Sequence, residues 1–95
     1  MEERVLVKKM IDIKVVFFAS FKEQLGCSQM EQSLEQGATI ADLCRILSGQ
    51  GGQWQTLFSE ANKNVKVACN HQMAEMSTIL NQSDEVAFFP PVTGG

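Results

Sequence analysis

The chain lacks a surplus of positive charge. Its 95 residues contain eight lysines and arginines against eleven aspartates and glutamates, for a net charge of −3. Nucleic acids and anionic membranes attract proteins through clustered basic residues, so this balance argues against both kinds of partner. The chain also has no apolar run of transmembrane length, and residues 1–9 contain no apolar core of a signal peptide. We therefore expect a cytoplasmic protein.

The residue types that hold metals or perform acid–base catalysis are sparse. The cysteines at positions 27, 44 and 69 match no close-paired metal motif, so we interpret them as small buried hydrophobes in a reducing compartment. His71 is the single histidine and belongs to no motif with aspartate or cysteine. No glycine-rich phosphate loop follows a strand. We predict no metal site and no cofactor bound by this chain.

Alternation of apolar and polar residues predicts the strands. The pattern is clearest over residues 11–18 and 84–89, and it recurs over residues 65–70. Residues 28–34 form a weaker candidate strand, because Gln32 interrupts the apolar side. The remaining predicted pieces are a turn at 71–73, a short extended piece at 78–80 and a turn at 81–84.

Two capping-box patterns predict the helices. Ser20 with Glu23 would begin a short helix that Gly26 ends, and Thr39 with Asp42 would begin a longer one. Glycines at 49, 51 and 52 would end the longer helix, and one further helical turn is expected over 54–58. The longer helix has an apolar stripe at helical spacing, formed by Ile40, Leu43, Cys44 and Leu47.

The order of these elements predicts the fold class. One main helix packed on a small mixed sheet is an α+β roll of the β-grasp, ubiquitin-like kind. The β-grasp domain is expected over residues 10–89, with the first and last strands adjacent at its centre because they are the most apolar. Residues 1–9 form an extension, which could be an edge strand, an arm or the product of an upstream start. The predicted core consists of Ile13, Val15, Phe17, Leu43, Leu47, Val67, Val86 and Phe88.

Residues 90–95 read as a slim tail that leaves the last strand. Pro90 and Pro91 cannot donate to a sheet ladder, so they end the strand and stiffen the exit. Gly94 and Gly95 carry no Cβ and pass where a side chain would clash. Such a tail suits delivery of its carboxylate into a narrow active site of another protein. The expected insertion segment is Pro90, Pro91, Val92, Thr93 and Gly94, with Gly95 as the reactive residue.

Two aromatic residues fall where strand parity predicts solvent. Phe18 and Phe89 lie on the polar side of the first and last strands, both at strand ends. If these strands pair in parallel, the two rings meet beside the root of the tail, and Met73 could join them. Contiguous exposed aromatics mark protein-binding sites. The alternative is that the helical turn over 54–60 covers them.

Two segments of this chain resemble the small, sulfur-carrying subunit of molybdopterin synthase. They are Ile13–Ala19 (IKVVFFA) and Asp84–Gly95 (DEVAFFPPVTGG), and the resemblance extends over about residues 10–95. It implies a β-grasp fold. It also implies that a ubiquitin-activating-type enzyme uses ATP to adenylate the Gly95 carboxylate, which is then converted to a thiocarboxylate.

The same resemblance implies where the sulfur goes. The tail would enter the large subunit of the synthase, in a heterotetramer, and give its sulfur to cyclic pyranopterin monophosphate. Catalytic side chains would come from the partners, so this chain would act as the sulfur-donating subunit without an independent catalytic site. The alternatives are the sulfur carrier of thiamin biosynthesis, whose tail lacks the Phe-Phe-Pro-Pro lead-in, a ubiquitin-like protein modifier, and a plain interaction module.

Overall fold

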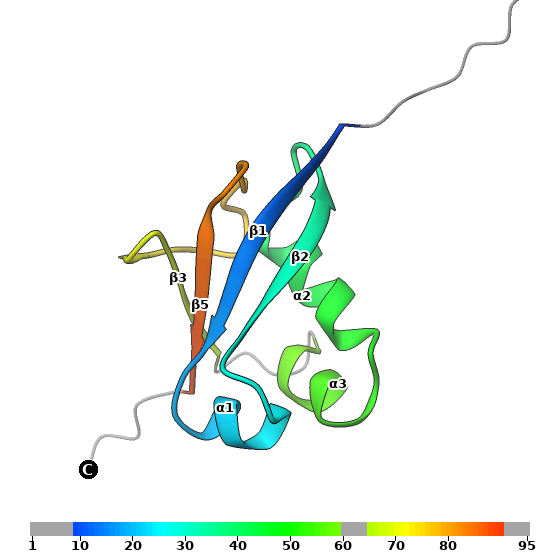
Figure 1. Cartoon of the computed structure of the whole chain (residues 1–95), viewed down its shortest axis with the longest axis vertical. Coiled ribbons are helices and arrows are strands. Elements are labelled where there is room, and N and C mark those ends of the chain that lie inside the picture. Colours follow the sequence, from blue (N-terminus) through cyan, green and yellow to red (C-terminus); the bar gives the residue numbers. More distant parts are fainter. Residues whose placement is uncertain (1–8, 60–64, 91–95) are drawn as a thin grey trace, which may run out of the picture.

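The computed structural model describes residues 9–59 and 65–90. A five-stranded mixed sheet has the spatial order β2-β1-β5-β3-β4, and β1 and β5 run parallel while the other neighbours run antiparallel (Figure 1). This arrangement confirms the predicted β-grasp fold. In chain order the elements are β1 (Met10–Phe17), α1 (Ser20–Leu25), β2 (Gln29–Glu35), α2 (Ile40–Ser48), α3 (Gly52–Phe58), β3 (Lys66–Cys69), β4 (Gln72–Met73) and β5 (Glu85–Phe89).

The two most apolar strands lie side by side in the sheet, as predicted. Val15 pairs with Val86 and Phe17 with Phe88, and all four side chains are buried on the face that the helices cover. Burial alternates along β1 because successive side chains of a strand point to opposite faces. All eight residues of the predicted core belong to one buried cluster, so the predicted core is confirmed.

The N-terminus of α2 carries the predicted capping box. The Thr39 N–H donates to Asp42 Oδ2 at 2.9 Å, and the Asp42 N–H donates to Thr39 Oγ1 at 3.3 Å. The backbone hydrogen bond from Thr39, followed by the side-chain bond from Arg45, lowers the pKa of the Asp42 carboxyl. Because the cap satisfies donors that a helix leaves unpaired, α2 begins at the residue that the sequence indicated.

The predicted capping box of α1 is wrong. Ser20 is the first helical residue instead of the cap, and Ala19 holds the cap position with φ 54° and ψ −132° and no side-chain hydrogen bond. The Phe21 N–H donates to the Phe18 carbonyl at 3.2 Å, which closes a tight turn directly after β1. The chain has to reverse here because β1 stays paired with β5 up to its end. Gly26 ends the helix in a left-handed conformation, as predicted.

The segment predicted as a turn at 71–73 is partly a strand. Asn70 and His71 both have positive φ, 52° and 71°, and form a two-residue hairpin turn. Such turns match the twist of their flanking strands, so Gln72 and Met73 fold back as β4 on β3. His71 is exposed in this turn, as the sequence predicted.

Aromatic rings fill the end of the core beneath α3. Phe58 lies 4.9 Å from Phe88 and Trp54 lies 5.5 Å from Phe17, measured between ring centroids. The single predicted helical turn is therefore a seven-residue helix, with Gly52 as its first residue. α3 packs on the core face of the sheet, which leaves the other face of β1 and β5 uncovered by it.

Candidate functional site

The outer face of the sheet carries an apolar patch next to the end of β5. One row of cross-strand neighbours runs from Val16 on β1 through Ala87 and Ala68 to Met73 on β4. Phe18 and Phe89 extend this row by one step toward the end of β5. We call these six residues the outer-face patch: Val16, Phe18, Ala68, Met73, Ala87 and Phe89.

The two aromatic residues of the patch form a stacked pair. The rings of Phe18 and Phe89 lie 5.1 Å apart with an interplanar angle of 6°. Phe18 is 45% exposed and Phe89 is half-buried. The predicted meeting of these rings is thus confirmed. The alternative was that the helical turn over 54–60 covers them, but α3, which contains residues 54–58, packs on the other face of the sheet. Trp54 and Phe58 of α3 contact the core-facing rings of Phe17 and Phe88 instead.

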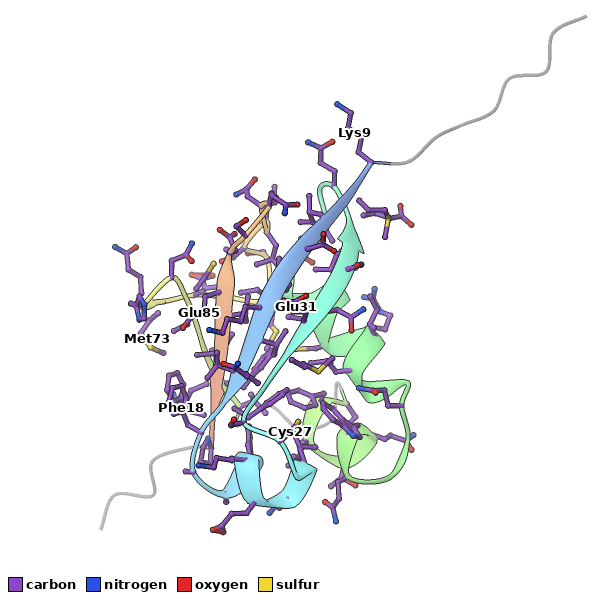
Figure 2. The ribbon with its side chains drawn as sticks, in the orientation of Figure 1. Lys9, Phe18, Cys27, Glu31, Met73 and Glu85 are labelled. Atoms are coloured by element: carbon purple, nitrogen blue, oxygen red, sulfur yellow. The ribbon has the colours of Figure 1, made fainter. Side chains whose placement is uncertain are left out.

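The β3–β4 hairpin places Met73 in the same surface. Met73 lies directly opposite Ala68 and is 69% exposed. Figure 2 shows its side chain on the same side of the molecule as Phe18. A thioether on an exposed, flexible side chain adapts to irregular surfaces, which makes Met73 suited to a binding surface.

Sequence analysis missed the two alanines of the patch. Ala68 and Ala87 occupy outer-face positions, yet they are only 6% and 8% exposed. Their side chains are small, so the longer side chains of the patch close over them. The alternation along the strands did contain a signal for them. Both alanines occupy positions on the side of the strand where the other residues are mostly polar.

Charged and amide side chains occupy the other half of the outer face. Lys14 on β1 lies between Glu31 on β2 and Glu85 on β5 in adjacent positions of the ladder. The Glu85 N–H donates to Asn70 Oδ1 at 3.0 Å, and Asn70 Nδ2 donates to Asp84 Oδ1 at 2.9 Å. The outer face therefore has an apolar patch beside the tail root, bordered by the exposed Lys66 opposite Phe89, and a polar half at the other end of β5.

The three thiols are free, and two are held in the protonated form. Burial raises the pKa of Cys44 to about 11. Burial, and then the negative charge of Asp84, raises the pKa of Cys69. Because the thiolate is the nucleophilic form, neither environment activates its sulfur. Cys44 is buried as predicted, whereas Cys27 and Cys69 are only half-buried.

Other functional features are few in the part of the chain that the structure describes. Within residues 9–59 and 65–90, no group of three or more His, Cys, Asp and Glu side chains could hold a metal ion. No helix in the described ranges is long and apolar enough to cross a membrane.

The tail begins at one end of the outer-face patch. Phe89 ends β5, and Pro90, which is half-buried, follows it directly. Pro91, Val92, Thr93, Gly94 and Gly95 lie outside the described residues, as does most of the predicted extension over 1–9. Their predicted roles remain predictions. What the structure establishes is that the tail starts beside the stacked pair of Phe18 and Phe89.

The exposed stack leads to a prediction about docking. Truncation of Phe18 or Phe89 to alanine should weaken partner binding by more than about 1 kcal/mol, because paired aromatics at an interface centre contribute disproportionately. The free energy of unfolding should fall by no more than about 1.5 kcal/mol, the contribution of one aromatic pair. Binding is measured by calorimetry and unfolding by urea titration. An unfolding loss above about 1.5 kcal/mol that matches or exceeds the loss of binding would mean that the two residues serve the monomer fold instead.

Comparison with known proteins gives the family. Residues 15–95 match the ThiS family. The chain is 34% identical over 83 residues to the molybdopterin synthase sulfur carrier subunit of Escherichia coli (strain K12), which covers 87% of this chain and 99% of that protein. It is 30% identical over 92 residues to small archaeal modifier protein 3 of Haloferax volcanii, which covers 90% of this chain and 100% of that protein.

Solved structures share the fold. SAMP1 from Haloferax volcanii superposes with a TM-score of 0.72 at 25% identity, over 88% of this chain and 99% of that one. A complex of subunits 1 and 2 of molybdopterin-converting factor from Helicobacter pylori contains a chain with a TM-score of 0.60 at 24% identity, over 90% of this chain and 100% of that one. The resemblance seen in the two sequence segments is confirmed, and this chain belongs to the ThiS family.

Proposed function

We propose that this chain is the sulfur-carrying subunit of a molybdopterin synthase and that the Gly95 carboxylate is its reactive group. The observation that carries the proposal is the tail. The family match extends through residue 95, and the tail starts beside an exposed apolar patch. The relative from Escherichia coli, which is a sulfur carrier subunit by name, aligns over nearly its whole length.

The proposed chemistry begins with activation of the tail. A carboxylate is a poor electrophile until a good leaving group is attached to it. Adenylation by a partner enzyme consumes ATP, releases pyrophosphate and leaves AMP bonded to the Gly95 carbonyl carbon. Hydrosulfide supplied by the sulfur donor then forms a bond to this carbon while AMP departs, which leaves a thiocarboxylate without any change of oxidation state. This chain needs to bind no cofactor of its own, because the partner binds the ATP.

The thiocarboxylate is the form that donates sulfur. It is ionised at neutral pH, and its sulfur is a better nucleophile than a carboxylate oxygen. Insertion of the tail into the large subunit would bring this sulfur to cyclic pyranopterin monophosphate. Gly94 and Gly95 would allow backbone to pass through a narrow channel, because neither has a Cβ. The catalytic side chains would belong to the partners.

The outer-face patch is the proposed docking surface for both partners, in the cytoplasm. It presents aromatic and methionine side chains around two buried alanines, and aromatic residues are enriched at interface centres. The solved complex of the two subunits from Helicobacter pylori supports an assembly with a large subunit, which we propose to be a heterotetramer. The position of the patch at the tail root would aim the tail into the partner that is docked there.

A second function is favoured by one specific relative. Small archaeal modifier protein 3 is 30% identical to this chain over its full length, so a role as a ubiquitin-like modifier has support of its own. Both functions would begin with the same adenylation of Gly95. They differ in the product, because a modifier forms an isopeptide bond with a lysine of a target protein.

Intact-protein mass spectrometry tests the proposal. Wild type is incubated with an activating enzyme of the ubiquitin-activating type, ATP and a sulfur donor. The expected result is a mass increase of one oxygen-to-sulfur exchange, located on the C-terminal peptide. Addition of the large subunit and cyclic pyranopterin monophosphate should return the mass to that of the carboxylate form. Lysine adducts in place of sulfur transfer would establish the modifier function instead.

A further inference from the structure

The outer edge of β2 is a row of backbone groups open to pairing. Hydrogen bonds from the Phe17 N–H to the Ser28 carbonyl and from the Gln36 N–H to the Lys9 carbonyl mark the bonded positions at the two ends of the β1–β2 ladder. Bonded and non-bonded pairs alternate in an antiparallel ladder. The N–H and C=O groups of Gln29, Glu31 and Ser33 therefore point away from β1, toward the free edge.

The hydrogen bonds of the described residues agree with this orientation. The Lys14 N–H, opposite Glu31, donates to the Asp84 carbonyl on the other side of β1. At the free edge, the Ser33 carbonyl accepts a bond from its neighbour Gln32 Nε2 at 3.1 Å. The outward backbone groups of Gln29 and Glu31 have no hydrogen-bond partner in the described part of the chain. A strand of this length with an uncovered edge is a template for another extended chain.

A groove adjoins this edge where β2 meets α2. It is an open groove of about 410 Å³. Its apolar lining is Leu34, Ala38 and Ile46, and its other lining residues are Glu35, Gln36, Gly37, Asp42 and Arg45. Ile46 is 43% exposed at this position, although its helix neighbour Leu47 is fully buried. The groove offers an apolar seat for side chains that alternate along a strand paired with β2.

The charges along the edge are negative. β2 contains Glu31 and Glu35 and no lysine or arginine. Asp12 on the adjacent strand lies opposite Ser33 and accepts its hydroxyl hydrogen bond at 2.7 Å. Cations also lie near the site: Lys14 is placed between Glu31 and Glu85, and Arg45 beside the groove is paired with Asp42 at 2.7 Å. The occupant that complements this edge is therefore positively charged.

We propose that the free edge of β2, with the groove beside α2, binds an extended basic peptide segment of a protein partner by strand addition. Main-chain hydrogen bonds to Gln29, Glu31 and Ser33 would hold the segment, alternate apolar side chains would enter the groove, and lysine or arginine side chains would face Glu31. This site is additional to the proposed sulfur-carrier function and uses a different surface.

A second copy of this chain fits the edge less well. Antiparallel pairing of two β2 strands centred on Glu31 places Glu31 opposite Glu31, and pairing centred on Ser33 places Glu31 opposite Glu35. Pairing centred on Gln32 avoids both contacts by placing Glu31 opposite Ser33. Like charges directly opposite each other destabilise a strand pair. Two of these three registers oppose like charges and the third gains no ion pair, so the acidic strand favours a basic partner over self-association.

The groove is separate from the outer-face patch, while the pairing edge approaches the patch at Gln29, which lies opposite Val16. The groove lies at the end of the sheet where Met10 pairs with Glu35, and the stacked pair lies at the other end, where Phe17 pairs with Phe88. Figure 1 shows α2 and the end of β2 on the opposite side of the sheet from β3, and away from the end of β5. A peptide that occupies the groove and the edge from Glu31 onward therefore leaves the stacked pair of Phe18 and Phe89 open to a partner.

The test uses a fluorescein-labelled octapeptide of alternating lysine and valine. Its amides are N-methylated at every second residue, so that one edge pairs and the peptide does not self-associate. Two matched controls are a fully N-methylated peptide and a glutamate–valine peptide of the same design. We expect a saturable increase in fluorescence anisotropy with the first probe only. In ¹⁵N spectra, the amide chemical-shift changes should be confined to residues 29–38 and 42–46. Absence of saturable binding, or shifts centred on Phe18 and Phe89, would overturn the proposal.

Two substitutions at one position separate backbone pairing from charge. Glu31→Pro removes the N–H that faces the free edge and leaves the ladder to β1 intact. The affinity for the lysine–valine probe should fall by about tenfold or more, since a hydrogen bond and an ion pair are both lost. Glu31→Gln should lower this affinity by only about threefold, because only the ion pair is lost. Phe18→Ala should bind the probe like wild type. A Glu31→Pro variant that keeps its ¹⁵N spectrum and binds like wild type would disprove strand addition, whatever the outcome for sulfur transfer.

Discussion

Deletion of Gly95 is expected to abolish thiocarboxylate formation and to leave the free energy of unfolding unchanged. The deletion moves the terminal carboxylate back by one residue, about 3.5 Å of chain, so it no longer reaches the adenylation site. Addition of one residue after Gly95 should also prevent thiocarboxylate formation, because the terminal carboxylate then lies one residue beyond the adenylation site. Gly94→Val should prevent thiocarboxylate formation because its side chain would block the narrow channel of the partner, although the Gly95 carboxylate is still present.

Mass and stability are measured on the same preparations. Unfolding is followed by the fluorescence of Trp54, which is the single tryptophan and packs against Phe17 in the core. A Gly95 deletion that still gained sulfur would place the sulfur elsewhere. The remaining sulfur-bearing candidates would be persulfides on Cys27, Cys44 or Cys69, and the carrier mechanism would then be wrong.

Leu43→Ala is expected to reduce the free energy of unfolding by about 2–5 kcal/mol. Leu43 is 0% exposed and belongs to the core cluster that α2 forms with the sheet. Truncation removes buried methyl groups and leaves a cavity that the rigid sheet cannot fill. The measurement is urea unfolding followed by Trp54 fluorescence and by circular dichroism.

Ile46→Ala supplies the matched control for this prediction. Ile46 lies on the same helix, three residues further on, but is 43% exposed. Its truncation should therefore lower the free energy of unfolding by less than about 1 kcal/mol, because much of its side chain already contacts water. Similar costs for the two variants would contradict the burial pattern of α2 and the packing of its predicted stripe.

The strongest sequence signals were those that report burial directly. Alternation over residues 11–17 and the helical stripe at Ile40, Leu43 and Leu47 predicted which side chains are buried, and the structure confirms each of them. A period of two or of 3.6 arises because one face of an element packs and the other is solvated. Short-range patterns of this kind need no knowledge of the partner element.

Local signals failed where a neighbouring strand determined the backbone. Ser20 has the sequence of a helix cap, but the turn at Ala19, directly after the pairing of β1 with β5, starts the helix one residue earlier than predicted. Met73 was assigned to a turn, but pairing with Ala68 makes it part of β4. At Ser20 a long-range strand pairing outweighs a local capping preference of about 1 kcal/mol, and at Met73 the pairing within the β3–β4 hairpin extends the strand.

The sequence by itself determined the β-grasp class, the core and the Gly-Gly tail, because these depend on periodicity and on the order of residues along the chain. Tertiary structure alone decided that Phe18 stacks on Phe89 and that two alanines complete an apolar surface around them. It also decided that β2 is an edge strand beside a groove. A surface or an edge is defined by which strands become neighbours, and that choice comes from pairing residues more than 50 positions apart, such as Val15 with Val86.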